Sequence, residues 1–231
     1  MIHNMSIKPD RDTTSELSGW FEPPYGQSFR KSGTAVVDVQ AIREVMGVDA
    51  VRRVLHYVHV EQEGSVVPRP YFVLGYRDYA QIHEAIREIY GQASHGILNR
   101  IGRITFRHFV GEQVDQMSAI GIALRLMPLQ ARKVFILRVI ARSMSESNHH
   151  DTVYLREGEG RLMLIDVDSP ACHSVSARTA ICWHTIGFIE EALQWATARD
   201  FKVEEVSCRA RGNTVCTFAI AREPSVPLHL A

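Results

Sequence analysis

Apolar residues recur at helical spacing through the middle of the chain. A first series, residues 82–89, has isoleucines three and four positions apart and ends at Gly91. A second series follows over residues 97–108, again with one apolar face. A third begins near Pro128, a residue that favours the first turn of a helix, and continues over residues 134–141. The pattern predicts a helix from Asp78 to about Gly91, a second over residues 97–108 and a third from near Pro128 through residue 141.

The N-terminal third has a weaker pattern. Residues 1–30 are polar and interrupted by glycine and proline, which is typical of a loosely ordered arm. Asp38 is a good cap for a short helix that runs to Met46, and residues 48–58 have a helical pattern. Two prolines within residues 64–70 predict a loop. We therefore expect an arm at 1–30, a segment without an assigned role at 31–75, a main domain at 76–224 and a tail at 225–231.

The pattern changes near residue 150, where short alternating runs separated by glycine turns replace the helical series. Each pair of runs indicates a β-hairpin. The expected elements are, in order, strands at 152–155 and 161–167 around a turn at 157–160, a helix from Ser176 or Thr179 to about Ala198, and strands at 202–208 and 214–221 around a turn at 211–213. Helices segregated from antiparallel hairpins predict an α+β fold, with a helical layer packed on a twisted antiparallel sheet made of two hairpins.

Charge and composition exclude several classes of protein. The chain has 26 basic and 26 acidic residues among 231, so it has no overall basic field for nucleic acid. Apolar residues make up 45%, enough for a core. The N-terminus lacks a secretory signal pattern, and no apolar run approaches the roughly 20 residues of a membrane span. We expect a cytoplasmic protein that neither spans a membrane nor binds nucleic acid directly.

All four cysteines lie in the last third of the chain: Cys172, Cys182, Cys208 and Cys216. In a reducing compartment, clustered cysteines are more often metal ligands than disulfides. Cys208 and Cys216 are equidistant from Gly212, so the predicted hairpin places them across from each other. Such a pair suits two thiolates on one metal ion.

Two further residues complete a tetrahedral set. Cys182 lies near the start of the long helix, where backbone amides stabilise a thiolate. Glu205 precedes Cys208 by three residues, so the two can share a metal only if the strand has a bulge or twist. The spacing Cys-x22-Glu-x2-Cys-x7-Cys fits structural zinc. The residues alone leave two alternatives open, namely small core cysteines with a solvated Glu205, or a disulfide between Cys208 and Cys216.

The same residues resemble the 4-vinyl-reductase domain family. The resemblance is carried by Cys182-Trp183, Gly187-Phe188, the run Glu205-Val206-Ser207-Cys208-Arg209-Ala210-Arg211-Gly212-Asn213, and Cys216. The family includes sensor domains of phenol- and toluene-responsive transcription activators and a protein of bacteriochlorophyll 4-vinyl reduction. No ATPase segment follows the matching residues, so we expect a free-standing member.

The resemblance carries several implications. It implies a structural zinc ion held by Cys182, Glu205, Cys208 and Cys216. It implies a fold similar to the vesicle-tethering TRAPP subunits, a homodimer, and a cavity for an apolar molecule between helices and sheet. The leading hypothesis is therefore a non-catalytic, zinc-stabilised sensor or carrier of a hydrophobic or aromatic small molecule, with a protein partner for signalling or delivery.

Candidate ligand contacts are apolar or aromatic residues on the faces expected to point inward. In the strand at 161–167, residues 163, 165 and 167 form a wholly apolar face, which we take as the inner one. Partly by resemblance to the family, the candidates are Phe106, Phe109, Phe135, Met163, Ile165, Trp183 and Phe188. For each of them, ordinary core packing is the alternative interpretation.

Other functions remain as alternatives. A tetrapyrrole biosynthesis or assembly factor is the second hypothesis, and a protein-interaction scaffold is the third. Catalysis is the least favoured, because Gly158-Glu159-Gly160 lacks the context of a dinucleotide-binding loop and the chain has no His-Glu-x-x-His pair. Cys172 is interpreted as a loop cysteine, with a nucleophile and base formed with His173, or a tetrapyrrole contact, as the alternatives. His149 and His150 are interpreted as a solvated helix end, with metal or heme ligation as the alternative. The arginines at 100, 103 and 107 are interpreted as a solvated face, with a partner or propionate contact as the alternative.

Overall fold

The computed structural model describes residues 33–57, 71–112, 114–147, 152–158 and 160–225. The predicted N-terminal arm, the loop at 64–70, His149 and His150, Glu159 in the first hairpin turn, and all of the tail at 225–231 except Ser225 lie outside these residues. Along the chain, the elements are β1 (Thr34–Asp38), α1 (Val39–Met46), α2 (Val48–Tyr57), β2 (Tyr71–Gly75), α3 (Tyr76–Tyr90), the short helix η3 (Gly91–Ala93), α4 (Ser94–Glu112), α5 (Val114–Arg125), α6 (Leu129–Ser147), β3 (Val153–Gly158), β4 (Arg161–Asp166), the short helix η4 (Pro170–Cys172), α7 (Trp183–Thr197), β5 (Val203–Ser207), the short helix η5 (Arg209–Arg211) and β6 (Cys216–Ile220).

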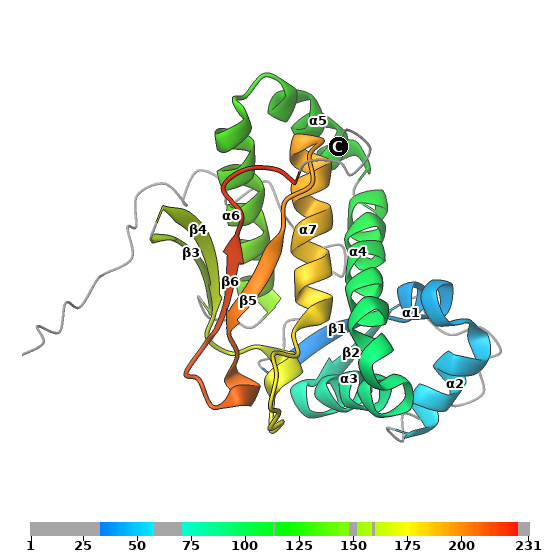
Figure 1. Cartoon of the computed structure of the whole chain (residues 1–231). Coiled ribbons are helices and arrows are strands. Elements are labelled where there is room, and N and C mark those ends of the chain that lie inside the picture. The colour runs from blue at the N-terminus through cyan, green and yellow to red at the C-terminus, as the bar shows by residue number, and fades with distance from the viewer. Residues whose placement is uncertain (1–32, 58–70, 113, 148–151, 159, 226–231) are drawn as a thin grey trace, which may run out of the picture.

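The main sheet has the order β3-β4-β6-β5, with all neighbours antiparallel. It consists of the two predicted hairpins, joined through β4 and β6. Helices α6 and α7 lie against one face of the sheet, and α4 packs on the far side of α7 (Figure 1). The α+β fold with a helical layer on an antiparallel sheet is therefore confirmed.

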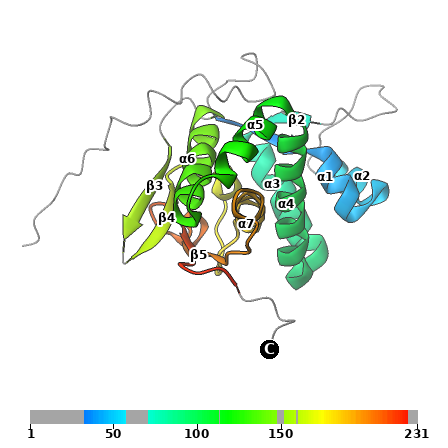
Figure 2. The ribbon, with the colours of Figure 1, turned by 90° about the horizontal axis from the view of Figure 1, so that it is seen from above.

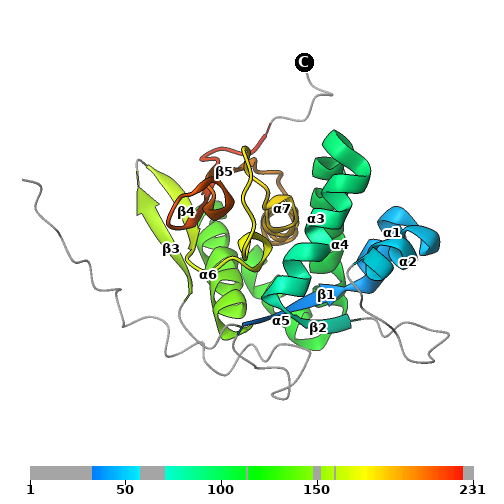
Figure 3. The same ribbon diagram turned by 90° about the horizontal axis from the view of Figure 1, so that it is seen from below.

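Two further views show how the layers follow one another. Seen from above, the layers follow one another across the molecule in the order main sheet, α6 and α7, then α3 and α4, with α1 and α2 at the outer edge (Figure 2). Seen from below, the small sheet of β1 and β2 lies beneath α3 and α4, away from the main sheet (Figure 3). Helix α7 is consequently covered on opposite sides and forms the centre of the molecule.

Helices α4 and α7 cross at unusually close range because glycines lie at the contact. A methyl group on Gly102 would lie 2.9 Å from the Phe188 nitrogen and closer still to the His184 carbonyl oxygen. A methyl group on Gly187 would collide in the same way with the backbone of Asn99. The two backbones thus pack against each other directly, and no larger residue fits at either position.

The inner face of the sheet is the opposite of the one predicted from the sequence. Leu164 is fully buried, Leu162 packs against the core, and both share a face with the buried Phe218. Met163 and Ile165 therefore point away from the helices. The prediction chose the face without a charged residue as the inner one. It failed because Asp166, the charged residue of the other face, is itself buried at the end of β4. Burial raises the pKa of Asp166 to about 6.

The N-terminal segment is an ordered part of the fold. Strand β1 pairs with β2 in antiparallel register, and α1 and α2 lie between them in sequence. The predicted cap of α1 is confirmed, since the Ala41 N–H donates to the Asp38 carboxylate at 2.9 Å. The sequence analysis missed both strands and helix α5, and it placed the start of α7 several residues too early. Among the described residues, no helix is long and apolar enough to cross a membrane.

His108 fastens this segment to α4. Its Nδ1 lies 2.7 Å from the carboxylate of the buried Asp38, and its Nε2 lies 3.0 Å from Glu44 on α1. Burial lowers the pKa of His108, but its hydrogen bond and its attraction to Asp38, together with Glu44, outweigh that effect and raise the pKa above its ordinary value. A protonated imidazole donates to both carboxylates at once.

The stabilisation by His108 is expected to depend on pH. Because the folded-state pKa is raised, the contribution is fully present below the unfolded value near 6.5 and is lost as pH rises through the folded value. Replacing His108 with glutamine should cost about 1–2 kcal/mol near pH 5.5 and less at pH 9, as measured by urea unfolding of both proteins at each pH. A cost that grows with pH would contradict this assignment.

Candidate metal centre and buried polar cluster

Four cysteine side chains meet at one end of the sheet. They come from four places in the fold: Cys172 from the end of η4, Cys182 from the position before α7, Cys208 from the position after β5 and Cys216 from the start of β6. All four are buried, and their sulfur atoms lie within 4.8 Å of one another. Since none forms a disulfide, the residues supply four free thiols that face a common centre.

The spacing of the sulfurs fits a tetrahedral zinc ion. A zinc–sulfur distance of about 2.3 Å makes the edge of a regular tetrahedron about 3.8 Å. The Cys172 sulfur lies 3.4, 3.7 and 3.6 Å from the sulfurs of Cys182, Cys208 and Cys216, and the Cys182 and Cys216 sulfurs are 3.8 Å apart. These distances are close to the tetrahedral edge, so the set has the size and the soft donors that zinc prefers.

The local backbone explains why the second hairpin can supply two of these thiols. The ladder between β5 and β6 shifts register between Glu205 and Ser207, which is the bulge that the sequence analysis required. After β5, the short helix η5 and Gly212, which has a φ of 91°, reverse the chain. The Asn213 side chain accepts from the Cys208 N–H at 3.2 Å and closes this turn.

The thiols strongly perturb one another. Hydrogen bonds from the Cys172 sulfur, and then from those of Cys182 and Cys216, lower the pKa of Cys208 far below its ordinary value. The neighbouring sulfurs, beginning with that of Cys172, raise the pKa of Cys182. The Arg209 N–H also donates to the Cys216 sulfur at 3.4 Å. The neighbouring sulfurs, beginning with that of Cys172, raise the pKa of Cys216 as well, so without a cation the cluster favours one thiolate, at Cys208, among thiols that keep their protons. Four thiolates at this position would need the positive charge of a metal ion.

Glu205 lies beside the cluster but is not a member of the group of sulfurs. Its Oε2 accepts from the Cys182 backbone N–H at 2.9 Å, and its Oε1 is buried without a partner among the described residues. Burial, and then the neighbouring Cys208, raise the pKa of Glu205 to about 7. The structure thus brings Glu205 to the start of α7, whereas Cys172, which the sequence analysis left out, meets the other three sulfurs.

A buried polar cluster adjoins the cysteines on the side of α3 and α4. The Tyr79 hydroxyl lies 3.5 Å from His184 Nδ1, and the Thr105 hydroxyl lies 3.4 Å from His184 Nε2. The His83 ring packs against both Tyr79 and His184, and its Nδ1 is buried without a partner in the described chain. Burial lowers the pKa of His184 to about 4 and also lowers that of His83, so both imidazoles are neutral.

An aromatic cluster continues from this polar group along α4 and α7. The Phe106 ring centroid lies 5.3 Å from that of Phe188 and 6.2 Å from those of Phe109 and Trp195. Trp183, at the start of α7, instead stacks on His95, and its indole N–H is buried without a partner in the described part of the chain. A large apolar surface and several under-used hydrogen-bonding groups therefore lie side by side in the interior.

The seven predicted ligand contacts are distributed over several places. Phe106, Phe109 and Phe188 meet in the aromatic cluster. Phe135 is partly buried against the main core and Trp183 lies at the metal end, while Met163 and Ile165 lie on the other face of the sheet. A surface hollow of about 250 Å³ is a different feature, lined largely by charged residues of the sheet and of the segments next to its strands.

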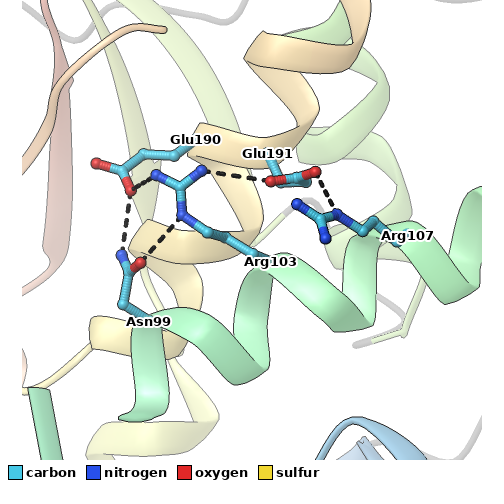
Figure 4. A network of polar contacts seen from close by, with 5 residues as sticks. All are labelled: Asn99, Arg103, Arg107, Glu190 and Glu191. Carbon is cyan, nitrogen blue, oxygen red and sulfur yellow. Dashed lines mark hydrogen bonds and ion pairs between the residues drawn. The ribbon is translucent and has the colours of Figure 1, made fainter. Parts of the chain in front are cut away.

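The arginine stripe of α4 binds carboxylates on α7 (Figure 4). The Arg103 guanidinium donates to Glu190 at 2.6 Å and to Glu191 at 3.3 Å, and Arg107 donates to Glu191 at 2.6 Å. Asn99 donates to Glu190 at 3.1 Å and accepts from Arg103. For Arg103 the prediction of a solvated face is wrong, because its side chain is only 31% exposed and pairs with two carboxylates of α7. Arg107 is 61% exposed, as predicted, although it also binds Glu191.

Replacing Arg103 with methionine should destabilise the protein much more than the same change at Arg107. The first variant leaves the largely buried Glu190 without its guanidinium partner and weakens the pairing of Glu191, which costs about 3 kcal/mol. Arg107 is 61% exposed, so its loss should cost less than about 1 kcal/mol. Thermal and urea unfolding of the two variants provide the comparison, and equal losses would count against a special role for Arg103.

Comparisons with known proteins agree with this description. Residues 166–222 match the 4-vinyl-reductase domain, the family indicated by the sequence resemblance, and this span contains all four cysteines and Glu205. A search of the curated proteins found no match.

Among solved structures, the fold is similar to H-NOX proteins. One is a mutant H-NOX protein from K. algicida in the Fe(II) unliganded state, with a TM-score of 0.53 and 12% identity over 84% of this chain and 95% of that one. Another is the S. oneidensis H-NOX protein in the Fe(II)NO state, with a TM-score of 0.52 and 10% identity over 79% and 93%. A third, from work on heme distortion in the H-NOX family, has a TM-score of 0.51 and 15% identity over 82% and 93%. At these identities the likeness shows the fold alone.

Proposed function

From the premise that residues 166–222 are a 4-vinyl-reductase domain, we propose that the protein is a non-catalytic binding protein, a sensor or carrier of a hydrophobic or aromatic small molecule, stabilised by structural zinc. The observation that carries the proposal is the tetrahedral spacing of four buried sulfurs within the matched span. Zinc at this position would fix the start of α7 to both hairpins. Because α7 also packs against α4, the metal would hold the helix that carries part of the aromatic cluster.

The interior indicates the chemical class of the ligand. The aromatic cluster offers apolar contact, and Tyr79, His83 and His184 lie at its end with weak or missing hydrogen bonds. Buried polar atoms without partners are uncommon and costly, so they suit a ligand that supplies the missing bond. A molecule with an aromatic body and one hydroxyl or carbonyl group matches this combination. Neutral imidazoles and a chain without net charge are both consistent with an uncharged ligand.

Two measurements test this function directly. Protein purified without chelators should contain about one zinc per chain, and less than about a tenth of an equivalent would contradict a structural site. Native mass spectrometry should also detect an apolar molecule retained from the native host. With 2-naphthol as a probe, replacing Phe188 with alanine should weaken binding, whereas the same change at the exposed Ile122 should not. Absence of both a retained molecule and probe binding would refute ligand binding.

A tetrapyrrole-binding role is the second candidate. The observation that favours it is the similarity of fold to H-NOX proteins, one of which is described in terms of its heme. Adding a porphyrin or chlorophyll precursor should then shift the pigment's absorbance at a ratio of one per chain. A spectrum that is the sum of its components would exclude this candidate and leave the first.

We further propose that the protein acts in the cytoplasm, as its sequence pattern indicates, and that it is a homodimer, as the family resemblance implies. Light scattering of the purified protein would give the mass directly. A monomer at micromolar concentration would contradict the dimer without affecting the metal or ligand assignments.

A further inference from the structure

We infer that Cys172, and not Glu205, is the fourth ligand of the metal, and that Glu205 is a positioning residue that acts through the backbone of Cys182. This inference rests on the proposed zinc site and specifies its composition. Five candidate donors compete for four tetrahedral positions: the four clustered cysteines and Glu205, which lies beside them at the Cys182 backbone. One of them must therefore lie outside the set of ligands.

The sulfur geometry favours Cys172. Each of its three sulfur–sulfur distances, 3.4 to 3.7 Å, is close to the edge of a zinc tetrahedron. To make Glu205 the fourth ligand, the Cys172 sulfur would have to leave a position that already has the required distance to all three of its neighbours. A buried thiol would then remain beside three thiolates and a metal without coordinating it.

The backbone around Cys172 holds the residue in place. Its N–H donates to the Ser169 carbonyl at 3.1 Å, and the following N–H donates to Pro170 at 3.2 Å, which closes the turn of η4. Two residues later, Ser174 has a φ of 57°, and the Ala177 N–H then donates to the Ala210 carbonyl of η5 at 2.8 Å. The loop that carries Cys172 is thus tied to the segment that follows Cys208, as expected for a ligand-bearing loop.

Glu205 already has a different role. Its Oε2 accepts the N–H of Cys182 at the start of α7, where a carboxylate also compensates the positive end of the helix dipole. This bond fixes the Cys182 backbone and therefore the direction of its sulfur. Glu205 Oε1 has no partner among the described residues, so this oxygen is the competing donor that an experiment must distinguish.

X-ray absorption of the zinc-loaded wild-type protein distinguishes a site of four cysteines from a site of three cysteines and Glu205, and it needs no variant. We expect four sulfur neighbours at about 2.3 Å, and three sulfurs with one oxygen at about 2.0–2.2 Å would overturn the inference. If the protein takes up no zinc or cobalt, both the proposed site and this inference fail. If it takes up metal with an oxygen ligand, only this inference fails.

Cobalt substitution gives the residue-level test. Replacing Cys172 with serine should lower the near-ultraviolet sulfur-to-cobalt absorbance per bound ion by about a quarter, because one of four thiolates is lost. Replacing Glu205 with glutamine, which keeps an acceptor for the Cys182 N–H, should preserve both this absorbance and the affinity. Replacing Glu205 with alanine should preserve the absorbance but weaken cobalt binding about 10–100-fold. Unchanged absorbance in the serine variant, or altered absorbance in the glutamine variant, would overturn the assignment.

Discussion

Replacing Gly102 with alanine is expected to destabilise the protein by about 3 kcal/mol, which lowers the melting temperature by roughly 6–12 °C in a chain of this length. The added methyl group would point at the His184 carbonyl and lie 2.9 Å from the Phe188 nitrogen. Both obstacles are backbone atoms of α7, so neither can move aside as a flexible side chain would. The helices must separate, and the surrounding aromatic contacts weaken with them.

The same helix offers a matched control. Gly96 also lies in α4, but a methyl group there meets nothing within 4 Å. Because alanine has the higher helix propensity, changing Gly96 to alanine should stabilise the protein by up to about 1 kcal/mol. Thermal unfolding of the two alanine variants side by side gives the result. If the melting temperatures of both variants shifted in the same direction, the close approach of α4 and α7 would not determine stability.

Removing the proposed zinc ion with a chelator is expected to destabilise the protein by as much as the Gly102 change, or by more. At a free zinc concentration about 1,000 times the dissociation constant, a bound ion stabilises the folded state by about 4 kcal/mol. Replacing Cys208 with serine should remove most of that contribution and expose apolar surface where the two hairpins meet α7. The measurement is thermal unfolding with and without a chelator.

The serine variant also serves as the control for the chelator. Wild-type protein should lose stability when the chelator is added, and the Cys208 variant should lose little more, because its site is already broken. A wild-type melting temperature that does not respond to a strong chelator would rule out a structural metal. An equal response in both proteins would mean that the chelator acts elsewhere.

The sequence predicted the parts of the fold that depend on local patterns. Spacing alone located the helices at 76–90 and 94–112 and both hairpins of the main sheet, because their contacts lie close in sequence. Strands β1 and β2 were missed because each pairs only with a strand more than 30 residues away. Helix α5 was missed because it is apolar on two sides, with Ile120 and Leu124 buried but Ile122 exposed, as is Leu126 just beyond its end. Such a helix has no single apolar stripe to detect.

The candidate site was predicted in part, for a similar reason. The hairpin symmetry about Gly212 indicated that Cys208 and Cys216 are neighbours, and the fold agrees. Cys172 ends the short helix η4 and leads into an irregular loop, so no periodicity in the sequence assigns its direction. The loop is held by long-range contacts, such as the bond between Ala177 and Ala210, that the sequence does not show. A count of four cysteines in 45 residues was the one signal in the sequence that pointed to Cys172.

The contact between α4 and α7 also bears on what constitutes a folding unit. The span that matches the 4-vinyl-reductase domain contains all four cysteines, but it excludes α4 and α6, which cover α7 on two sides. An excised fragment of residues 166–222 would retain the chemistry of a metal site and leave the bare backbone at Gly187 open to solvent. We therefore expect the cooperative folding unit to be larger than the recognisable family signature, and the helices before residue 166 to be required for that signature to fold.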